Sequence, residues 1–122
     1  MKKMVAFFEI PCSDFNRAIT FYEVLFGVEL SVYDYEDEKM AFFSDDTSPS
    51  CGAISWAENF KPSKDGVLIS FSCENMDKSL DLIEQNGGEV LIPKTRIESD
   101  GRGYFSVFID CEGNRVGLWS QK

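Results

Sequence analysis

The sequence predicts an α+β fold in which two βαβββ modules follow each other in tandem. The main observation is an internal repeat: residues 8–30 (FEIPCSDFNRAITFYEVLFGVEL) match residues 69–91 (ISFSCENMDKSLDLIEQNGGEVL) with an offset of 61 residues. Each copy opens with a bulky strand-forming run, continues into a helical pattern, and is followed by three more strand-like runs. Because repetition at a fixed offset indicates two copies of one structural unit, the repeat sets the architecture before any single element is assigned.

The first copy begins with a strand and a helix. We predict a strand over residues 5–10, broken by Pro11. Ser13 or Asp14 can cap the helix that follows, and Gly27 is placed to end it. The i, i+3, i+4, i+7 spacing predicts that the inner face of this helix consists of Phe15, Ala18, Ile19 and Tyr22.

The second copy repeats this scheme. We predict a strand over residues 67–73, a helix capped by Asn75, and a stop at Gly87-Gly88. The spacing places four residues on the inner face of the helix: Met76, Ser79, Leu80 and Ile83.

Three further strands are predicted in each copy, at 28–33, 39–44 and 52–56 in the first and at 89–97, 104–109 and 115–119 in the second. Turns are expected at the acidic residues 34–38, at Asp100-Gly101 and at residues 112–114. A polar linker separates the copies. We therefore expect one domain over 1–122, with module 1 at about 1–58, a linker at about 59–65 and module 2 at about 66–122.

The amino-acid composition excludes some classes of binding partner. Twelve basic against twenty-one acidic residues give a net charge of −9, which repels nucleic acid and anionic membranes. No apolar run approaches the roughly 20 residues of a membrane span, and the first residues lack the features of a secretory signal. We therefore expect a cytoplasmic protein. Its four cysteines are then expected to be reduced thiols, for which a packing role is favoured over a catalytic or metal-binding one.

Three segments together resemble the glyoxalase, bleomycin-resistance and extradiol-dioxygenase superfamily, also called the vicinal oxygen chelate superfamily. These are FEIPCSDFNRAITFYEVLFG with its D-x-x-R-A-x-x-F-Y pattern, LIEQNGGEV, and DCEGNRVGLWS near the end. The resemblance covers essentially the whole chain and is greatest to small glyoxalase-like proteins. It implies a paired βαβββ fold, in which a curved mixed sheet surrounds a central cavity and the helices lie outside.

The resemblance also implies where a metal ion would be bound. The family's ligand positions correspond here to Phe7, Leu68 and Gly117, with Ile54 or Ser55 as the fourth. The first three have no side-chain donor atom, and the chain contains no histidine. We therefore expect no family-type metal centre and no other cofactor.

Strand alternation predicts the lining of the expected cavity. If Phe8 and Ile10 face the helix, Phe7 and Glu9 face inward; in the second copy the inward residues are Leu68, Ser70 and Ser72. From the last strands we expect Gly52, Ile54 and Trp56, and Arg115, Gly117 and Trp119, with the two tryptophans at equivalent positions as paired stacking surfaces or as core residues.

Two charged residues are candidates for chemistry. Glu9, among aromatic residues, can act as a general base or bind a cation; alternatively it is solvated or paired with Arg115 or Lys94. Arg102, between two glycines, can fold over the cavity mouth to hold an anion, or can be a solvated turn residue.

Two functions remain open from the sequence. The first is metal-independent binding of a small organic molecule by a bleomycin-resistance-like protein, for which the resemblance implies a homodimer. The second is a lyase, isomerase or epimerase that uses Glu9 as the base, with Arg102 or a serine as oxyanion partner.

Overall fold

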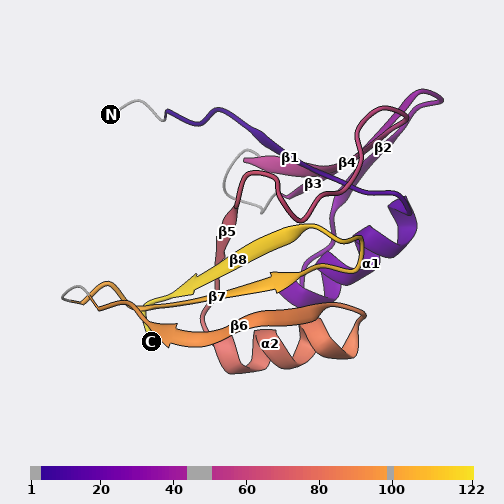
Figure 1. Ribbon diagram of the computed structural model, residues 1–122. Coiled ribbons are helices and arrows are strands. Elements are labelled where there is room, and N and C mark those ends of the chain that lie inside the picture. Colours follow the sequence, from indigo (N-terminus) through magenta and orange to yellow (C-terminus); the bar gives the residue numbers. More distant parts are fainter. Residues whose placement is uncertain (1–3, 44–50, 99–100) are drawn as a thin grey trace. The chain divides into compact units, whose positions relative to one another are not determined.

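The computed structural model describes residues 4–43, 51–98 and 101–122, and this part of the chain forms eight strands and two helices (Figure 1). Their order is βαβββ twice, as predicted. The chain divides into two compact units, Met1–Pro62 and Ser63–Lys122, which we call module 1 and module 2. The boundary lies inside the predicted linker. The elements are β1 (Phe8–Pro11), α1 (Phe15–Phe26), β2 (Ser31–Asp34), β3 (Glu38–Phe43), β4 (Gly52–Ala57), β5 (Ser70–Ser72), α2 (Met76–Gln85), β6 (Glu89–Arg96), β7 (Tyr104–Ile109) and β8 (Arg115–Ser120).

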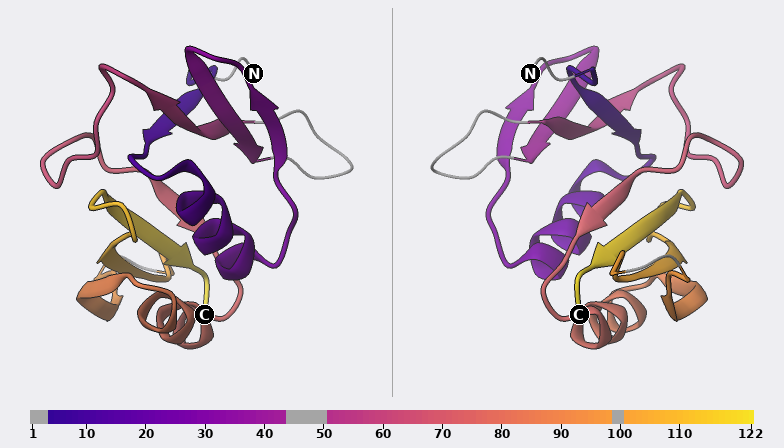
Figure 2. Two further views of the ribbon diagram at one scale, coloured as in Figure 1. Left: turned by 90° about the vertical axis from the view of Figure 1, so that its right-hand side faces the viewer. Right: turned by 90° about the vertical axis from the view of Figure 1, so that its left-hand side faces the viewer.

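Module 1 is a four-stranded mixed sheet in the order β1-β4-β3-β2, with α1 on one side of it (Figure 2). Strand β1 pairs with β4 in parallel, and the other pairs are antiparallel. Aromatic rings join the helix to the sheet: the Phe43 ring lies 5.6 Å from Tyr22 and 6.0 Å from Phe8. Gly52 lies beside them, and a Cβ atom there would come within 2.5 Å of the Phe8 ring. The core of module 1 therefore lies between α1 and this face of the sheet.

Helix α1 begins and ends as expected, but its buried stripe differs. The Arg17 N–H donates to the Asp14 carboxylate at 3.0 Å, which makes Asp14 the N-cap, and Gly27 ends the helix in the left-handed region at φ 65°. Ile19, predicted on the inner face, is only partly buried, whereas Phe21 is buried and packs edge-on against Tyr22 at 5.0 Å. The aromatic packing thus rotates the buried stripe, which consists of Phe15, Ala18, Phe21, Tyr22 and Leu25.

Module 2 repeats this topology in the order β5-β8-β7-β6, and α2 lies along β6 (Figure 1). Asn75 caps α2 by accepting a hydrogen bond from the Lys78 N–H at 3.1 Å, as predicted. The core of the module is formed by side chains with almost no exposed surface: Met76, Ile83, Phe108, Val116 and Leu118.

Strand ends differ from the sequence prediction. Strands β1 and β5 begin three residues later than expected, so Phe7 and Leu68 precede them. Strand β2 begins at Ser31 rather than at residue 28, because the Val28 N–H still donates to the Glu23 carbonyl at the helix end and the Leu30 N–H donates to the Glu23 carboxylate. Ser44 and Asp100, predicted in a strand and a turn, lie outside the described residues.

Neither α1 nor α2, the helices of the described part of the chain, has the length and apolar character needed to cross a bilayer.

Candidate functional site

The pairing of strands in module 1 decides which residues share the face of Glu9. Residues paired across neighbouring strands point to the same side of a sheet. Glu9 pairs with Ala53, whereas Phe8 and Ile10, on the helix side, pair with Gly52 and Ile54. The prediction that Gly52, Ile54 and Trp56 share the face of Glu9 is therefore wrong: alternation along β4 puts them on the helix side.

The two tryptophans do not occupy equivalent positions. Pro11 and Ser72 are equivalent in the repeat; Pro11 pairs with Ser55, whereas Ser72 pairs with Trp119. The module 1 counterpart of Trp119 is therefore Ser55. The offset between the modules is 61 residues in their first strands and 64 in their last strands, so the sequence repeat does not extend in register to the last strand.

The family's metal-ligand positions have no donor atoms. Phe7 and Leu68 precede β1 and β5, with 39% and 47% of their surface exposed. Gly117 pairs with Ser70, and its counterpart in module 1 is Ala53, rather than Ile54 or Ser55. Four apolar residues thus stand at these positions, and within the described ranges no group of three or more Cys, Asp or Glu side chains is placed to hold a metal ion. The residues present do not fit the family's metal centre.

Glu9 is exposed and hydrogen-bonded to a serine of the neighbouring strand. The Ser55 hydroxyl donates to Oε1 of Glu9 at 2.8 Å, and Ser55 itself is only 2% exposed. On the same face, the Phe7 ring lies 6.0 Å from the Phe42 ring of β3. The hydrogen bond fixes the orientation of the carboxylate, while its exposure leaves it accessible to a ligand.

The same face of module 1 has a hollow of about 300 Å³. Its lining comes from the β2–β3 hairpin: Tyr33, Tyr35, Glu38, Met40 and Phe42. The sequence prediction missed these residues, although their alternation with Asp34, Lys39 and Ala41 is the signal that places them on one face. They form a mainly apolar concave surface with one carboxylate, which is the usual composition of a small-molecule site.

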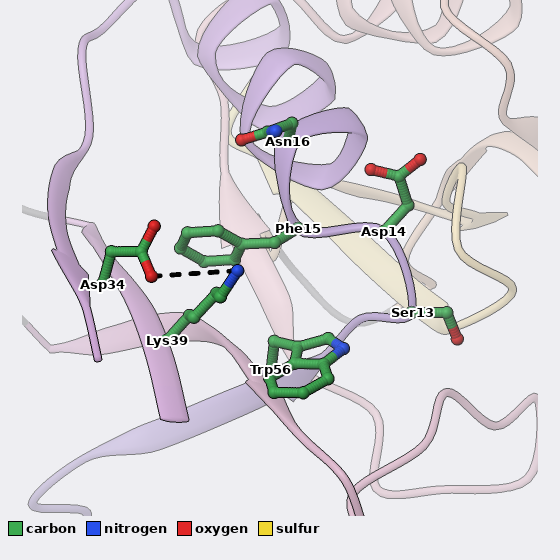
Figure 3. A pocket seen from close by; sticks show the side chains of 7 residues that line it. All are labelled: Ser13, Asp14, Phe15, Asn16, Asp34, Lys39 and Trp56. Carbon is green, nitrogen blue, oxygen red and sulfur yellow. Dashed lines mark ion pairs between the residues drawn. The ribbon is translucent and has the colours of Figure 1, made fainter. Parts of the chain in front are cut away.

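A second hollow of about 380 Å³ lies on the helix side of module 1, at the start of α1 (Figure 3). Lys39 reaches into it, with its Nζ atom 3.8 Å from Asp34 and 5.7 Å from the centroid of the Trp56 ring. Ser13, Asp14, Phe15 and Asn16 complete the lining. The ammonium group is thus already paired with a carboxylate and an aromatic ring of its own module.

In module 2, Ser70, Gly117 and Trp119 share one face, as predicted. A Cβ atom at residue 117 would collide with the Ser70 hydroxyl, so glycine leaves room for that hydroxyl. The Trp119 indole N–H donates to the carbonyl of Arg102 at 2.7 Å, while the Arg102 residue is exposed. The tryptophan therefore holds the hairpin backbone that carries the predicted anion-binding arginine.

The four cysteines are thiols in the structure. Cys12, fully buried, lies where β1 leads into α1, and its Sγ is 3.5 Å from the Ser55 carbonyl oxygen. Burial raises the pKa of the Cys73 thiol, and this is only partly opposed by a hydrogen bond with Ser79 and by the charge of Lys94. Cys73 is therefore a neutral thiol at pH 7, as suits a packing role rather than nucleophilic attack.

Solved structures show where this fold occurs. The chain is similar to a glyoxalase/bleomycin resistance protein from Albidiferax ferrireducens T118, with 15% identity and a TM-score of 0.71 over 97% of this chain and 98% of the other. It is similar to the fosfomycin resistance protein FosX from Listeria monocytogenes, with 18% identity and a TM-score of 0.69 over 98% and 92%. Glyoxalase I from Zea mays matches with 16% identity and a TM-score of 0.71 over 95% of this chain but only 45% of its own length.

At these identities the structural likeness shows the fold alone. No curated protein sequence matches the chain. The family model described as Glyoxalase/Bleomycin resistance protein/Dioxygenase superfamily matches residues 4–118, which is nearly the whole chain. The protein therefore belongs to the glyoxalase/bleomycin resistance protein/dioxygenase superfamily.

Proposed function

We propose that this protein binds a small organic molecule without a metal ion, and that the ligand contacts the face of module 1 that carries Glu9. One observation carries the proposal: apolar residues occupy the family's metal-ligand positions, while the adjoining face keeps a hollow lined by aromatic side chains. The central cavity expected from the family resemblance stays a prediction, and the residues that support binding lie in module 1.

Membership of the superfamily supports a small molecule as the ligand. The names of the similar structures include a bleomycin resistance protein and a fosfomycin resistance protein, both associated with small organic compounds. Without a Lewis acid, a family member has lost the group that would polarise a substrate oxygen, but it retains surface for binding. Binding or sequestration is therefore the activity that this set of residues supports best.

The test is a binding screen on protein dialysed against a chelator, with a panel of neutral, cationic and anionic aromatic molecules followed by calorimetry and by amide chemical shifts. We expect ligands that shift the amides around Glu9 and Phe42 in the absence of metal. The variant Phe42→Ala should weaken binding about tenfold, because it removes one ring from the face. Phe60→Ala, which also removes a partly exposed ring of module 1, should leave binding unchanged.

Binding that requires an added divalent metal ion would contradict the proposal. So would a panel in which no compound shifts the amides of the Glu9 face. Thermal melts of both variants, compared with the unmodified protein, separate loss of binding from loss of folding.

The second candidate is an enzyme of lyase, isomerase or epimerase type that uses Glu9 as the general base. The hydrogen bond from Ser55 favours it, because an oriented and accessible carboxylate is what proton abstraction requires. If a substrate is found, Glu9→Gln should lower kcat by about 100-fold or more. An unchanged kcat in that variant would remove Glu9 from the mechanism.

A cytoplasmic location and a homodimer complete the proposal. The dimer rests on the family resemblance alone, and sedimentation measured at several protein concentrations would test it.

A further inference from the structure

The hollow on the β2–β3 hairpin combines aromatic rings with negative charge. We call it the hairpin hollow, and it is lined by Tyr33, Tyr35, Glu38, Met40 and Phe42. We propose that it selects organic cations, in which a quaternary or tertiary ammonium group is attached to a small aromatic or apolar body. This inference rests on the proposed function and names the class of ligand that its site would take.

Strand pairing brings these five side chains together. Tyr33 lies directly across from Met40, and the Tyr35 N–H donates to the Glu38 carbonyl at 3.1 Å. Phe42 is two residues further along the same face of β3. Four of the five lining residues thus lie on two paired strands, and the fifth, Tyr35, directly follows β2 and is held by its backbone hydrogen bond to Glu38.

The aromatic rings of the hairpin hollow contact one another and still have exposed surface that a ligand can reach. Tyr33 and Tyr35 are stacked at 6.0 Å with an interplanar angle of 21°, and Tyr33 meets Phe42 edge-on at 5.5 Å and 86°. Tyr33 and Tyr35 keep 51% and 64% of their surface exposed. Exposed aromatic rings attract an ammonium group through their quadrupole, and the flexible thioether of Met40 can adapt to an apolar body.

The charged side chains that the described strands β1 to β4 place on this face are acidic. Glu38 lines the hollow and Glu9 lies on the same side of the sheet, whereas Lys39 points to the other side, where it pairs with Asp34. Among the residues that the structure describes, no basic side chain lines the hairpin hollow. With a net charge of −9 for the whole chain, an anion is repelled and a cation attracted.

The size of the hollow favours a small ligand. Its volume of about 300 Å³ is at the lower end of the range for small-molecule sites. A substituted phenyl ring with a trimethylammonium group therefore suits it better than a large polycyclic compound.

The test uses three phenols that differ in one tetrahedral group. These are (4-hydroxyphenyl)trimethylammonium, its neutral isostere 4-tert-butylphenol, and the anion 4-hydroxybenzenesulfonate. Titrations of the full chain, followed by amide chemical shifts, should show the cation binding at least about fivefold more tightly than the neutral isostere. The sulfonate should bind more weakly than either, and the shifts should centre on the hairpin hollow.

Two variants and one control variant show which groups cause the preference for the cation. Glu38→Gln should weaken cation binding by roughly threefold and leave the isostere unchanged, since only the charged ligand senses the carboxylate. Glu36→Gln removes the same charge from the neighbouring turn, outside the lining, and should have a smaller effect. Tyr33→Leu keeps an apolar side chain but removes the π-system, and should weaken the cation more than the isostere.

The outcomes separate this inference from the proposed function. If the neutral isostere binds the hairpin hollow as tightly as the cation, or if Glu38→Gln leaves their ratio unchanged, the inference fails while small-molecule binding stands. If none of the three phenols binds and the wider panel leaves the Glu9 face unperturbed, both fail.

Discussion

Two buried serines of module 2 differ in a single hydrogen bond. Ser106 and Ser120 lie on neighbouring strands, and each is 1% exposed. The Ser120 hydroxyl donates to the Lys122 carbonyl at 2.8 Å, whereas the Ser106 hydroxyl has no hydrogen-bond partner among the described residues. A buried hydroxyl that has lost its hydration without gaining a partner costs free energy of folding.

We therefore expect Ser106→Ala to raise the free energy of unfolding by about 1 kcal/mol. Ser120→Ala is the matched control, because it removes the same atom from an equally buried site but breaks a hydrogen bond, and it should lower the free energy of unfolding by about 1 kcal/mol. Urea unfolding followed by circular dichroism measures both. Equal destabilisation by the two changes would mean that the Ser106 hydroxyl is satisfied.

At the scale of elements, the β6–β7 hairpin depends on one glycine at its end. Gly103 has φ 85°, and its carbonyl accepts a hydrogen bond from the Ile97 N–H at 2.9 Å. A Cβ atom there would collide with the Ser120 carbonyl oxygen of β8. The position therefore requires both the backbone freedom and the small size of glycine.

Gly103→Ala should lower the free energy of unfolding by about 2 kcal/mol or more, because the side chain meets both an unfavourable φ and a fixed backbone oxygen. Gly66→Ala, in the same module, is the control: a Cβ atom there would meet no described atom within 4 Å and its φ is not positive, so the change should be near zero. Chemical denaturation of the two variants tests this, and a Gly103→Ala protein as stable as Gly66→Ala would contradict it.

The elements also show what the sequence could and could not predict. Helix caps are local features, so the sequence predicts Asn75 and Gly27 as helix boundaries and narrows the first cap to Ser13 or Asp14, of which the structure uses Asp14. The prediction of which β4 side chains share the face of Glu9 was wrong, because it depends on which residues of β1 pair with β4, and a long stretch of chain separates these strands. Because side chains alternate with a period of two, an error of one residue in the register assigns every side chain of the strand to the opposite face, as for Trp56.

For the whole molecule, the internal repeat predicted the topology correctly but did not predict the candidate binding site. It predicted two modules with one order of elements, which the structure confirms. It could not reveal the hairpin hollow, because Tyr33, Tyr35 and Met40 belong to the β2–β3 hairpin, which follows the repeated segment, and have no matched partner in it. A sequence repeat cannot indicate binding features that only one of the two modules has.

The net charge of −9 gives the last prediction, which concerns the response of binding to salt. The field of the whole chain attracts a cation from beyond the hairpin hollow, and salt screens that field because the Debye length falls from about 10 Å at 0.1 M to about 3 Å at 1 M. Raising sodium chloride across this range should weaken binding of (4-hydroxyphenyl)trimethylammonium by roughly threefold and leave 4-tert-butylphenol unchanged or slightly tighter. Titrations at several salt concentrations measure the slope. In Glu38→Gln the slope should decrease without vanishing, since the other acidic residues remain. A cation affinity independent of salt would mean that the aromatic rings alone select the ligand and that the charge of the chain has no part in it.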